Sequence, residues 1–305
     1  MKKILITGGA GFIPSSLANA LLSTNNYFVV AVDNYLTGKK AHIASHPNYR
    51  FIKGDVNDLN EISPIMLHYG FDVVFHYAAV VGVSRTIDNP KLVLDDIKGL
   101  QNIFDLAKNT GVKRIFFSSS SEVYGEPVHL PQNEHETPLN SRLPYAVVKN
   151  IGECFCRSYE KEFGLNYTIF RFFNTYGPRQ SDDFVVSKFL EAAVSNKDIT
   201  LYGDGSQTRT FCYIEDNIEF TIKALEEDLF LNDVVNVGND KLTTILALAE
   251  TIIRITDSKS RIIHLPSLKE GDMTRRQPDI TKMKNALNHP LVTLEDGLKM
   301  VLLTH

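Results

Sequence analysis

Short, fully apolar runs alternate with longer segments of helical period in the first half of the chain, and this alternation restricts the fold more than any other feature. Strands that are apolar on both faces suit a parallel sheet covered by helices. The pattern therefore predicts an α/β fold built on a doubly wound parallel sheet. The expected strands are Ile4–Thr7, Phe28–Asp33, Tyr49–Gly54, Val73–His76, Arg114–Ser118 and Tyr167–Phe172. The expected helices are Ile13–Ser23, Glu61–Tyr69, Pro90–Thr110 and Pro144–Phe163.

Beyond Asn174 the alternation of apolar runs and helical segments ends, and loops rich in Gly, Asp and Arg follow. This change indicates a smaller C-terminal α/β lobe. A chain of 305 residues is above the usual size of a single domain, so two lobes are expected. We predict a first domain over residues 1–172, rejoined by about residues 213–238, and a second lobe over residues 173–305. Since no Gly/Ser/Pro-rich linker separates them, the lobes should pack tightly around a cleft.

Composition excludes several classes of protein. The chain is 43% hydrophobic, and 32 basic against 36 acidic residues give a net charge of -4, which excludes a disordered chain and gives no electrostatic case for nucleic-acid binding. No apolar run approaches the ~18 residues of a membrane span, and Ile4–Ile6 is too short for a signal peptide. Cys154, Cys156 and Cys212 lack the spacing of common zinc sites. We therefore expect reduced thiols, no metal and a cytoplasmic location.

The segment Thr7–Ser15 joins the first expected strand to the first expected helix, and it contains Gly8 and Gly11. Glycines at such a turn let the backbone approach a pyrophosphate, which the helix N-terminus stabilises. Pro14 stands where a third glycine is usual; proline is tolerated in a first helical turn, but close packing of helix on strand is then in question. The context of strand, loop and helix predicts a dinucleotide site.

Polar residues at the ends of the next strands refine this prediction. Asp33 ends the second strand, where a carboxylate can accept both hydroxyls of an adenosine ribose and repels a 2′-phosphate, so NAD is favoured over NADP. Asp55 follows the third strand and is expected near the adenine amino group. His76 ends the fourth strand, and we interpret it as a structural histidine rather than a catalyst.

Tyr145 and Lys149 have i, i+4 spacing, so both side chains share one face of a helix. A tyrosine is a poor base at neutral pH until nearby positive charge lowers its pKa, and Lys149 and an oxidised nicotinamide could supply that charge. The pair gains weight from the run Ser118–Gly125, which begins at the carboxyl end of a strand, where ligands of such folds bind.

In combination these motifs resemble the extended short-chain dehydrogenase/reductases that act on nucleotide sugars, and the resemblance covers nearly the whole chain. It implies a Rossmann sheet with NAD as cofactor, Tyr145 as acid/base, Lys149 on the nicotinamide ribose and Ser120 on the reacting sugar hydroxyl. It also implies a cofactor site lined by Gly8, Gly11, Phe12, Ile13, Asp33, Asn34, Asp55, Val56, Tyr77, Ala78, Ala79, Ser118, Tyr145, Lys149 and Phe172.

The same resemblance covers three loops of the second lobe. It implies that Asn174 contacts the diphosphate of the substrate, that Arg209 clamps it, that Asp272 lies near the nucleoside ribose and that Arg276 lies near the phosphates or sugar. A guanidinium suits these roles because it makes bidentate contacts with phosphate. Besides Pro14, the sequence departs from the family pattern at Asp96, where an asparagine is usual, and at Thr210, where an aspartate is frequent.

The family pattern leaves the reaction open. The shared first step is oxidation at C4 of the sugar, and we predict a 4-epimerase acting through a transient 4-keto sugar. Ser121 and Glu122 stand where 4,6-dehydratases carry an Asp-Glu pair and UDP-glucuronate decarboxylases a Ser-Glu pair, so a decarboxylase is the first alternative and a dehydratase the second. A decarboxylase would give Glu122 a catalytic role. A redox-sensing regulator without chemistry is disfavoured because Tyr145 and Lys149 are both present.

The resemblance also implies a homodimer formed through the helix over 90–110 and the helix that carries Tyr145. Val93, Ile97 and Ile103 could contribute to that interface, although an apolar stripe at this position is equally expected to face the sheet.

Overall fold

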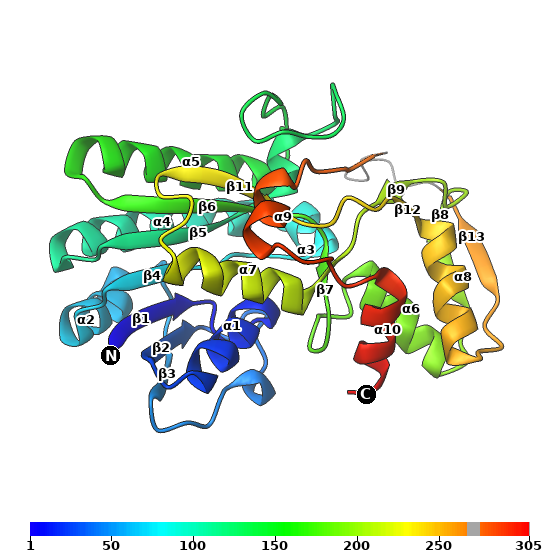
Figure 1. Cartoon of the computed structure of the whole chain (residues 1–305), viewed down its shortest axis with the longest axis horizontal. Coiled ribbons are helices and arrows are strands. Elements are labelled where there is room, and N and C mark those ends of the chain that lie inside the picture. The colour runs from blue at the N-terminus through cyan, green and yellow to red at the C-terminus, as the bar shows by residue number, and fades with distance from the viewer. Residues whose placement is uncertain (267–274, 305) are drawn as a thin grey trace.

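A seven-stranded sheet runs through the larger part of the molecule (Figure 1), in a computed structural model that describes residues 1–266 and 275–304. Its order is β11-β6-β5-β4-β1-β2-β3, and every neighbouring pair is parallel. The strands are β1 (Lys2–Thr7), β2 (Tyr27–Asp33), β3 (Tyr49–Lys53), β4 (Val73–His76), β5 (Arg114–Ser120), β6 (Asn166–Phe172) and β11 (Asp233–Val237). The predicted doubly wound sheet is confirmed.

Helices cover both faces of the sheet. One face carries α1 (Phe12–Ser23) and α7 (Ile214–Glu226), which pack against each other, and the other carries α2 (Leu59–Tyr69), α4 (Pro90–Thr110) and α5 (Pro144–Phe163). The apolar stripe of α4 is turned inward, because Val93 and Ile103 are fully buried in the core on that face and Ile97 is packed against it. The stripe therefore belongs to the sheet side of the helix rather than to an outer surface.

A smaller lobe lies beside the carboxyl ends of the strands, to the right in Figure 1. Its helices are α6 (Val185–Val194), α8 (Ile245–Thr256) and α10 (Leu294–Leu302), and its parallel strand pair is β8 (Ile199–Tyr202) with β13 (Ile262–Leu265). Short strands line the border: β7 (Thr175–Tyr176), β9 (Thr208–Arg209), β10 (Cys212–Tyr213) and β12 (Thr243–Thr244). The chain returns from this lobe to the sheet through α7 and β11, and again through α9 (Thr281–Leu287), which packs on both.

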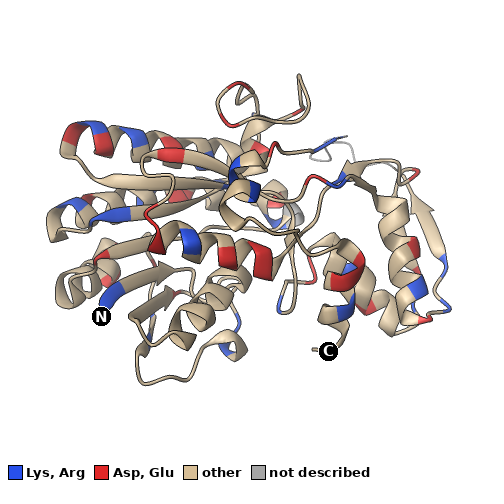
Figure 2. Ribbon diagram, viewed as in Figure 1, with Lys and Arg blue, Asp and Glu red and all other residues tan. Residues whose placement is uncertain are grey.

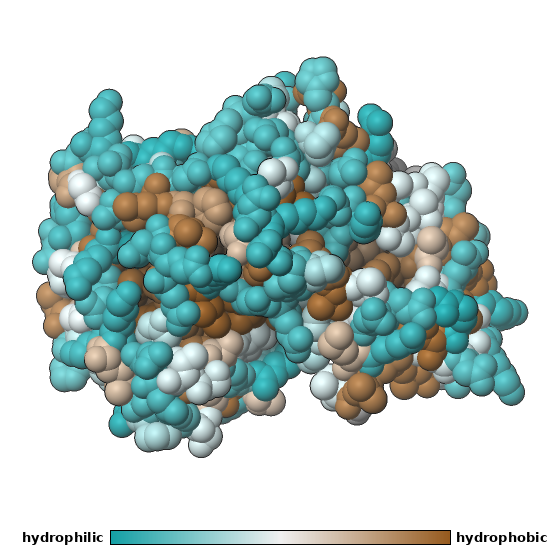
Figure 3. All heavy atoms as spheres, in the orientation of Figure 1, coloured by the Kyte–Doolittle hydropathy of each residue, from teal (hydrophilic) through white to brown (hydrophobic). Residues whose placement is uncertain are grey.

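Charged residues of both signs are interspersed along the helices, whereas most of the sheet consists of uncharged residues (Figure 2). The face in Figure 3 is mostly hydrophilic, with patches of hydrophobic residues among the hydrophilic ones. Over the described residues, no helix combines the length and apolarity needed to cross a membrane.

Strand order places the site. In the sheet, β1 lies between β4 and β2, so the chain winds in opposite directions from this point, and the loops that follow β1 and β4 diverge to leave a crevice. The short helices α3 (Val83–Asp88), η1 (Lys40–His42) and η2 (Ser121–Tyr124) lie in loops that follow β4, β2 and β5. Side chains at these strand ends therefore converge on one crevice.

Candidate active site

A cavity of about 450 Å³ lies at this crevice. Its lining includes every cofactor residue predicted from the sequence, namely Gly8, Gly11, Phe12, Ile13, Asp33, Asn34, Asp55, Val56, Tyr77, Ala78, Ala79, Ser118, Tyr145, Lys149 and Phe172. Ser120, Glu122, Asn174 and Arg276 line it as well. Arg209 is buried in β9 and donates to the Thr208 carbonyl, but it is not among the described residues that line the cavity. Asp272 lies outside the described residues.

The glycine loop brings two layers of backbone together. Gly8 has a φ of 71°, which favours glycine. A Cβ at Gly8 would lie 2.9 Å from the Cα of Ala78, so the loops after β1 and β4 can come into contact only because residue 8 has no side chain. Gly11 caps α1, and the Gly11 N–H donates to the Gly8 carbonyl at 2.8 Å. Pro14 lies in the first turn of α1, as expected. The close approach to β2 is made by Gly9, whose Cβ would lie 2.5 Å from that of Ala31.

The Asp33 carboxylate can accept hydrogen bonds beyond those it already makes within the protein. Its carboxylate accepts from the N–H of Ala10 at 3.0 Å and of Tyr35 at 2.6 Å, and burial raises its pKa while these two bonds oppose the rise. A carboxylate offers about four acceptor positions, so two of them stay available to a ligand. Asn34 donates to Asp55 at 3.0 Å and ties the second strand end to the third. A glycine-lined helix N-terminus beside a spare carboxylate fits the pyrophosphate and ribose of a dinucleotide.

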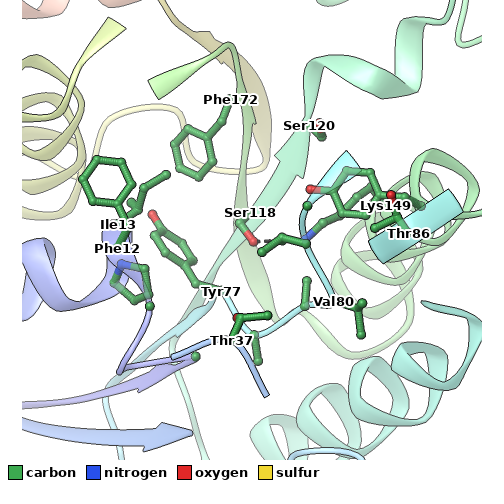
Figure 4. Close-up of a pocket in the computed structure, with 18 of the residues that line it drawn as sticks. Phe12, Ile13, Thr37, Tyr77, Val80, Thr86, Ser118, Ser120, Lys149 and Phe172 are labelled. Carbon is green, nitrogen blue, oxygen red and sulfur yellow. Dashed lines mark hydrogen bonds between the residues drawn. The ribbon is translucent and has the colours of Figure 1, made fainter. Parts of the chain in front are cut away.

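His76 is structural. Its Nδ1 lies 2.9 Å from the hydroxyl of Thr7, which also accepts the N–H groups of Tyr77 and Ala78 at 3.0 Å. Burial and the charge of Lys149 lower the pKa of His76 to about 3, so the ring is neutral at working pH. The network fixes the strand end from which Tyr77 extends toward Phe172 and Phe12 in Figure 4.

Lys149 reaches from α5 across the end of β5. Its ammonium donates to the Ser118 hydroxyl at 3.2 Å (Figure 4) and lies 5.7 Å from the centre of the Tyr145 ring. Ser118 in turn donates to the His76 carbonyl at 3.2 Å. Burial lowers the pKa of Lys149 to about 8, and Asp96 opposes that effect.

Tyr145 differs from the sequence expectation in one respect. Its pKa is raised, chiefly by burial and then by the charge of Glu122, whereas a hydrogen bond with Ser120 and the charge of Arg276 lower it. The Lys149 ammonium, 5.7 Å from the ring centre, does not bring the pKa of this phenol down to its ordinary value. The tyrosine therefore needs the positive charge of a bound cofactor before it can act as a base.

Arg276 and Glu122 face each other across the two lobes. Arg276 is 8% exposed, its terminal nitrogen lies 3.7 Å from the Glu122 carboxylate, and its Nε has no hydrogen-bond partner within the described part of the chain. A buried guanidinium with an unused donor favours an anionic ligand. Because Arg276 acts on the pKa of Tyr145, that ligand would lie at the reacting end of the cavity.

The cavity also contains residues that sequence reasoning did not assign to the site. Asn57 and Asp96 line it from the loop after β3 and from α4, and Thr86 and Gln180 line it from α3 and from the loop before α6. Asn57 follows the Gly54–Val56 motif directly, so its position was a usable signal. Gln180 carries no such signal. It is 169 residues from Gly11 in the sequence, and only the folding of the chain brings it to the same cavity.

Comparison with known proteins agrees with this geometry. The model of the NAD dependent epimerase/dehydratase family matches residues 4–238. The chain belongs to this family. It is 37% identical to a UDP-N-acetyl-alpha-D-glucosaminuronate decarboxylase of Bacillus cytotoxicus, over 98% of this chain and 96% of the relative.

Two solved structures are similar over nearly their whole length. A UDP-glucose 4-epimerase of Thermotoga maritima with UDP-glucose has a TM-score of 0.92 and 31% identity, covering 98% of this chain and 97% of that one. A UDP-glucuronic acid 4-epimerase of Bacillus cereus, in complex with UDP-glucuronic acid and NAD, has a TM-score of 0.90 and 32% identity, covering 99% and 100%.

As a member of this family the chain is an enzyme, and its cofactor is NAD. The relatives and similar structures include nucleotide-sugar epimerases, decarboxylases and a 4,6-dehydratase, so all three chemistries that the sequence left open lie within the family. Among the described residues there is no cluster of three or more histidine, cysteine or carboxylate side chains that could hold a metal.

Proposed function

We propose that this enzyme acts on a UDP-linked hexuronic acid, oxidises it at C4 and releases its C6 carboxyl group as carbon dioxide. The observation that carries the proposal is the buried Arg276 at the reacting end of the cavity, with a 3.7 Å contact to Glu122 and an Nε donor that has no partner among the described residues. A neutral sugar offers no anion there, whereas the carboxylate of a hexuronate does. The curated decarboxylase relative and the solved uronate complex support the same substrate class.

The chain's own residues would share the work as follows. Ser120 orients the sugar 4-hydroxyl, and Tyr145 takes its proton. Lys149, charged and fixed on Ser118, holds the nicotinamide ribose and stabilises the phenolate. Bound NAD would accept the hydride from C4 and, once reduced, return it to the sugar.

Oxidation at C4 makes the sugar a β-keto acid, from which carbon dioxide leaves with its bonding electrons kept at C5. Arg276 binds the carboxylate before that step. Glu122, beside Arg276, repels the carboxylate but not neutral carbon dioxide, so it favours release. A proton then replaces the lost carboxyl at C5, and the C4 ketone is reduced back to an alcohol, so the net products are a UDP-pentose and carbon dioxide.

The 4-epimerase predicted from the sequence is the second candidate. It needs only Ser120, Tyr145 and Lys149 at C4, all of which line the cavity, and the Thermotoga maritima epimerase has the same fold throughout. In that case Arg276 would orient the sugar and Glu122 would take no part in the chemistry.

Product analysis separates the two reactions. The purified enzyme is incubated with UDP-glucuronate, UDP-N-acetylglucosaminuronate, UDP-glucose and UDP-GlcNAc, and carbon dioxide and the nucleotide-sugar products are measured together. We expect carbon dioxide and a UDP-pentose from a uronate substrate. An epimer formed without carbon dioxide would contradict decarboxylation and support the epimerase.

A further inference from the structure

The contact between Arg276 and Glu122 depends on two segments that are far apart in the sequence. Glu122 lies in η2, which ends at Tyr124, and Arg276 lies in the segment 275–279. Both segments are hydrogen-bonded to the side chain of Asn236, which belongs to β11 and is fully buried. One buried amide therefore connects the two sides of the contact.

Asn236 uses both polar ends of its side chain. Its amide nitrogen donates to the carbonyl of Gln132 at 2.9 Å and to the carbonyl of Asp279 at 3.1 Å. Its amide oxygen accepts the Tyr124 hydroxyl at 2.7 Å. Loss of this side chain would leave buried polar groups without partners, which is costly, so these positions are fixed together.

Gln132 attaches the same segment through its backbone. The Gln132 N–H donates to the Gln277 carbonyl at 2.7 Å, and the Gln132 carbonyl accepts the Asp279 N–H at 2.8 Å. Because the Asn236 amide binds the carbonyls of both Gln132 and Asp279, it holds the two strands of this pairing against β11.

The other end of the segment is attached to the border of the smaller lobe. Arg275 forms a β-bridge with Thr208 in β9. Arg276 lies between this bridge and the bonds to Gln132, and its side chain lines the cavity. The backbone on both sides of Arg276 is therefore fixed.

The η2 side of the contact is fixed by a buried ion pair. Arg171 donates to the Tyr124 hydroxyl at 2.8 Å and is paired with Glu153 through bonds of 2.8 and 2.7 Å. Glu153 also accepts the Ser119 hydroxyl at 2.7 Å. All four side chains are buried, so the network fixes η2 relative to the end of β5.

We propose that Asn236 is a positioning residue that sets the preference of the cavity for a charged sugar, because it holds the segment of Arg276 at a fixed distance from the turn of Glu122. The proposal rests on the proposed function for the role of Arg276 in binding a carboxylate. Asn236 is not one of the described residues that line the cavity, so it acts through the two segments that it joins.

The variant Asn236→Ala removes the connection, and Tyr124→Phe removes only one of its bonds and spares the fold. Both are made in holoenzyme that carries Tyr145→Phe, so that bound sugars stay intact. Calorimetry compares the affinity for UDP-glucuronate with that for UDP-glucose, and the affinity for UDP-N-acetylglucosaminuronate with that for UDP-GlcNAc. We expect the preference for the uronate to fall about tenfold in Asn236→Ala and about threefold in Tyr124→Phe, as for coupled groups of one hydrogen-bond network.

The matched control is Tyr27→Phe. Tyr27 is 5% exposed in β2, and its hydroxyl donates to Glu226 at 2.9 Å, so the variant removes a buried tyrosine hydroxyl that has no bond to the Arg276 segment. It should leave the preference unchanged. Asn236→Ala combined with Arg276→Met should lose no more preference than Arg276→Met alone, because Asn236 acts through Arg276.

A general loosening of the fold would weaken charged and neutral sugars alike. Equal losses for both kinds of sugar, an unchanged preference in the variants that fold, or losses that multiply in the double variant would each overturn the proposal. A parent that binds uronates no better than neutral sugars would overturn it as well. Failure of the proposed function alone is distinguishable, because it shows as a preference for uronates without release of carbon dioxide.

Discussion

At the scale of single residues, Tyr145 depends on its ligands for its reactivity. Its pKa is raised in the free site, so the phenolate forms only when bound positive charge offsets burial and Glu122. We expect Tyr145→Phe to lower turnover by roughly 100- to 10,000-fold, because the ring stays and the proton acceptor is lost. Turnover and substrate affinity are measured side by side, and affinity should change only a few-fold. A variant that kept more than about a tenth of the parent rate would refute Tyr145 as the base.

Arg276 should act on charged sugars alone. A hydrogen bond to a charged group contributes about 1.5–3 kcal/mol, so Arg276→Met should lower kcat/KM for UDP-glucuronate by roughly 10- to 150-fold and leave UDP-glucose binding unchanged. The neighbouring Arg275 is exposed, so Arg275→Met is a matched control for loss of one positive charge. Equal losses with charged and neutral sugars would place Arg276 on the diphosphate instead.

Glu122 separates the two candidate reactions. Two like charges about 6 Å apart interact by about 2.8 kcal/mol at an effective dielectric constant of ~20, which corresponds to about 100-fold in rate. Glu122→Gln should therefore slow carbon dioxide release by about 100-fold if repulsion assists decarboxylation. Carbon dioxide release and epimer ratio are followed in one assay. If Glu122→Gln changes neither the rate of carbon dioxide release nor the rate of epimer formation, Glu122 has a structural role.

At the scale of secondary-structure elements, the outer faces of α4 and α5 carry apolar side chains that the core does not use. Leu94 is 45% exposed and Val147 is 37% exposed. We expect these faces to form the homodimer interface, where burying a leucine contributes about 1.5–3 kcal/mol. Leu94→Glu should shift the sedimentation of the protein from dimer to monomer. Leu67→Glu on α2, at a position 68% exposed, is the control and should leave it unchanged. A parent that sediments as a monomer would contradict the prediction.

Elements whose signals are local could be predicted from the sequence, and elements fixed by distant contacts could not. The β1 strand, the turn at Gly8 and the position of Asp33 follow from apolar periodicity and backbone conformation within a few residues. The seventh strand β11 is specified by pairing with β6, as in Asp233 with Thr168, which is 65 residues earlier in the chain. The contact of Arg276 with Glu122 likewise depends on how the lobes meet, so the motifs suggested its residues but not their pairing.

At the scale of the whole molecule, the buried His76 links the site to acid stability. Its pKa is lowered from 6.5 to about 3 in the folded state, so only the unfolded chain gains a proton between these values. The free energy of unfolding should therefore fall by up to about 1.4 kcal/mol per pH unit as the pH decreases through this window, and above it His76 contributes no pH dependence. Denaturant titrations of His76→Asn against the parent measure the difference. Parallel pH curves for the two proteins would show that His76 is protonated when folded.

The repeated passage of the chain between its two lobes limits how the cavity can open. The sheet, α7, β11 and α9 belong to one side, while α6, α8 and α10 belong to the other, so several covalent connections cross the cleft. Lobes joined at so many points cannot swing apart like two halves on a single hinge. A dinucleotide bound in the cavity between such lobes would have no wide exit. NAD should therefore stay bound through many turnovers and through dialysis, as a prosthetic group does. Its reduced form would be reoxidised by the 4-keto sugar formed in the same turnover.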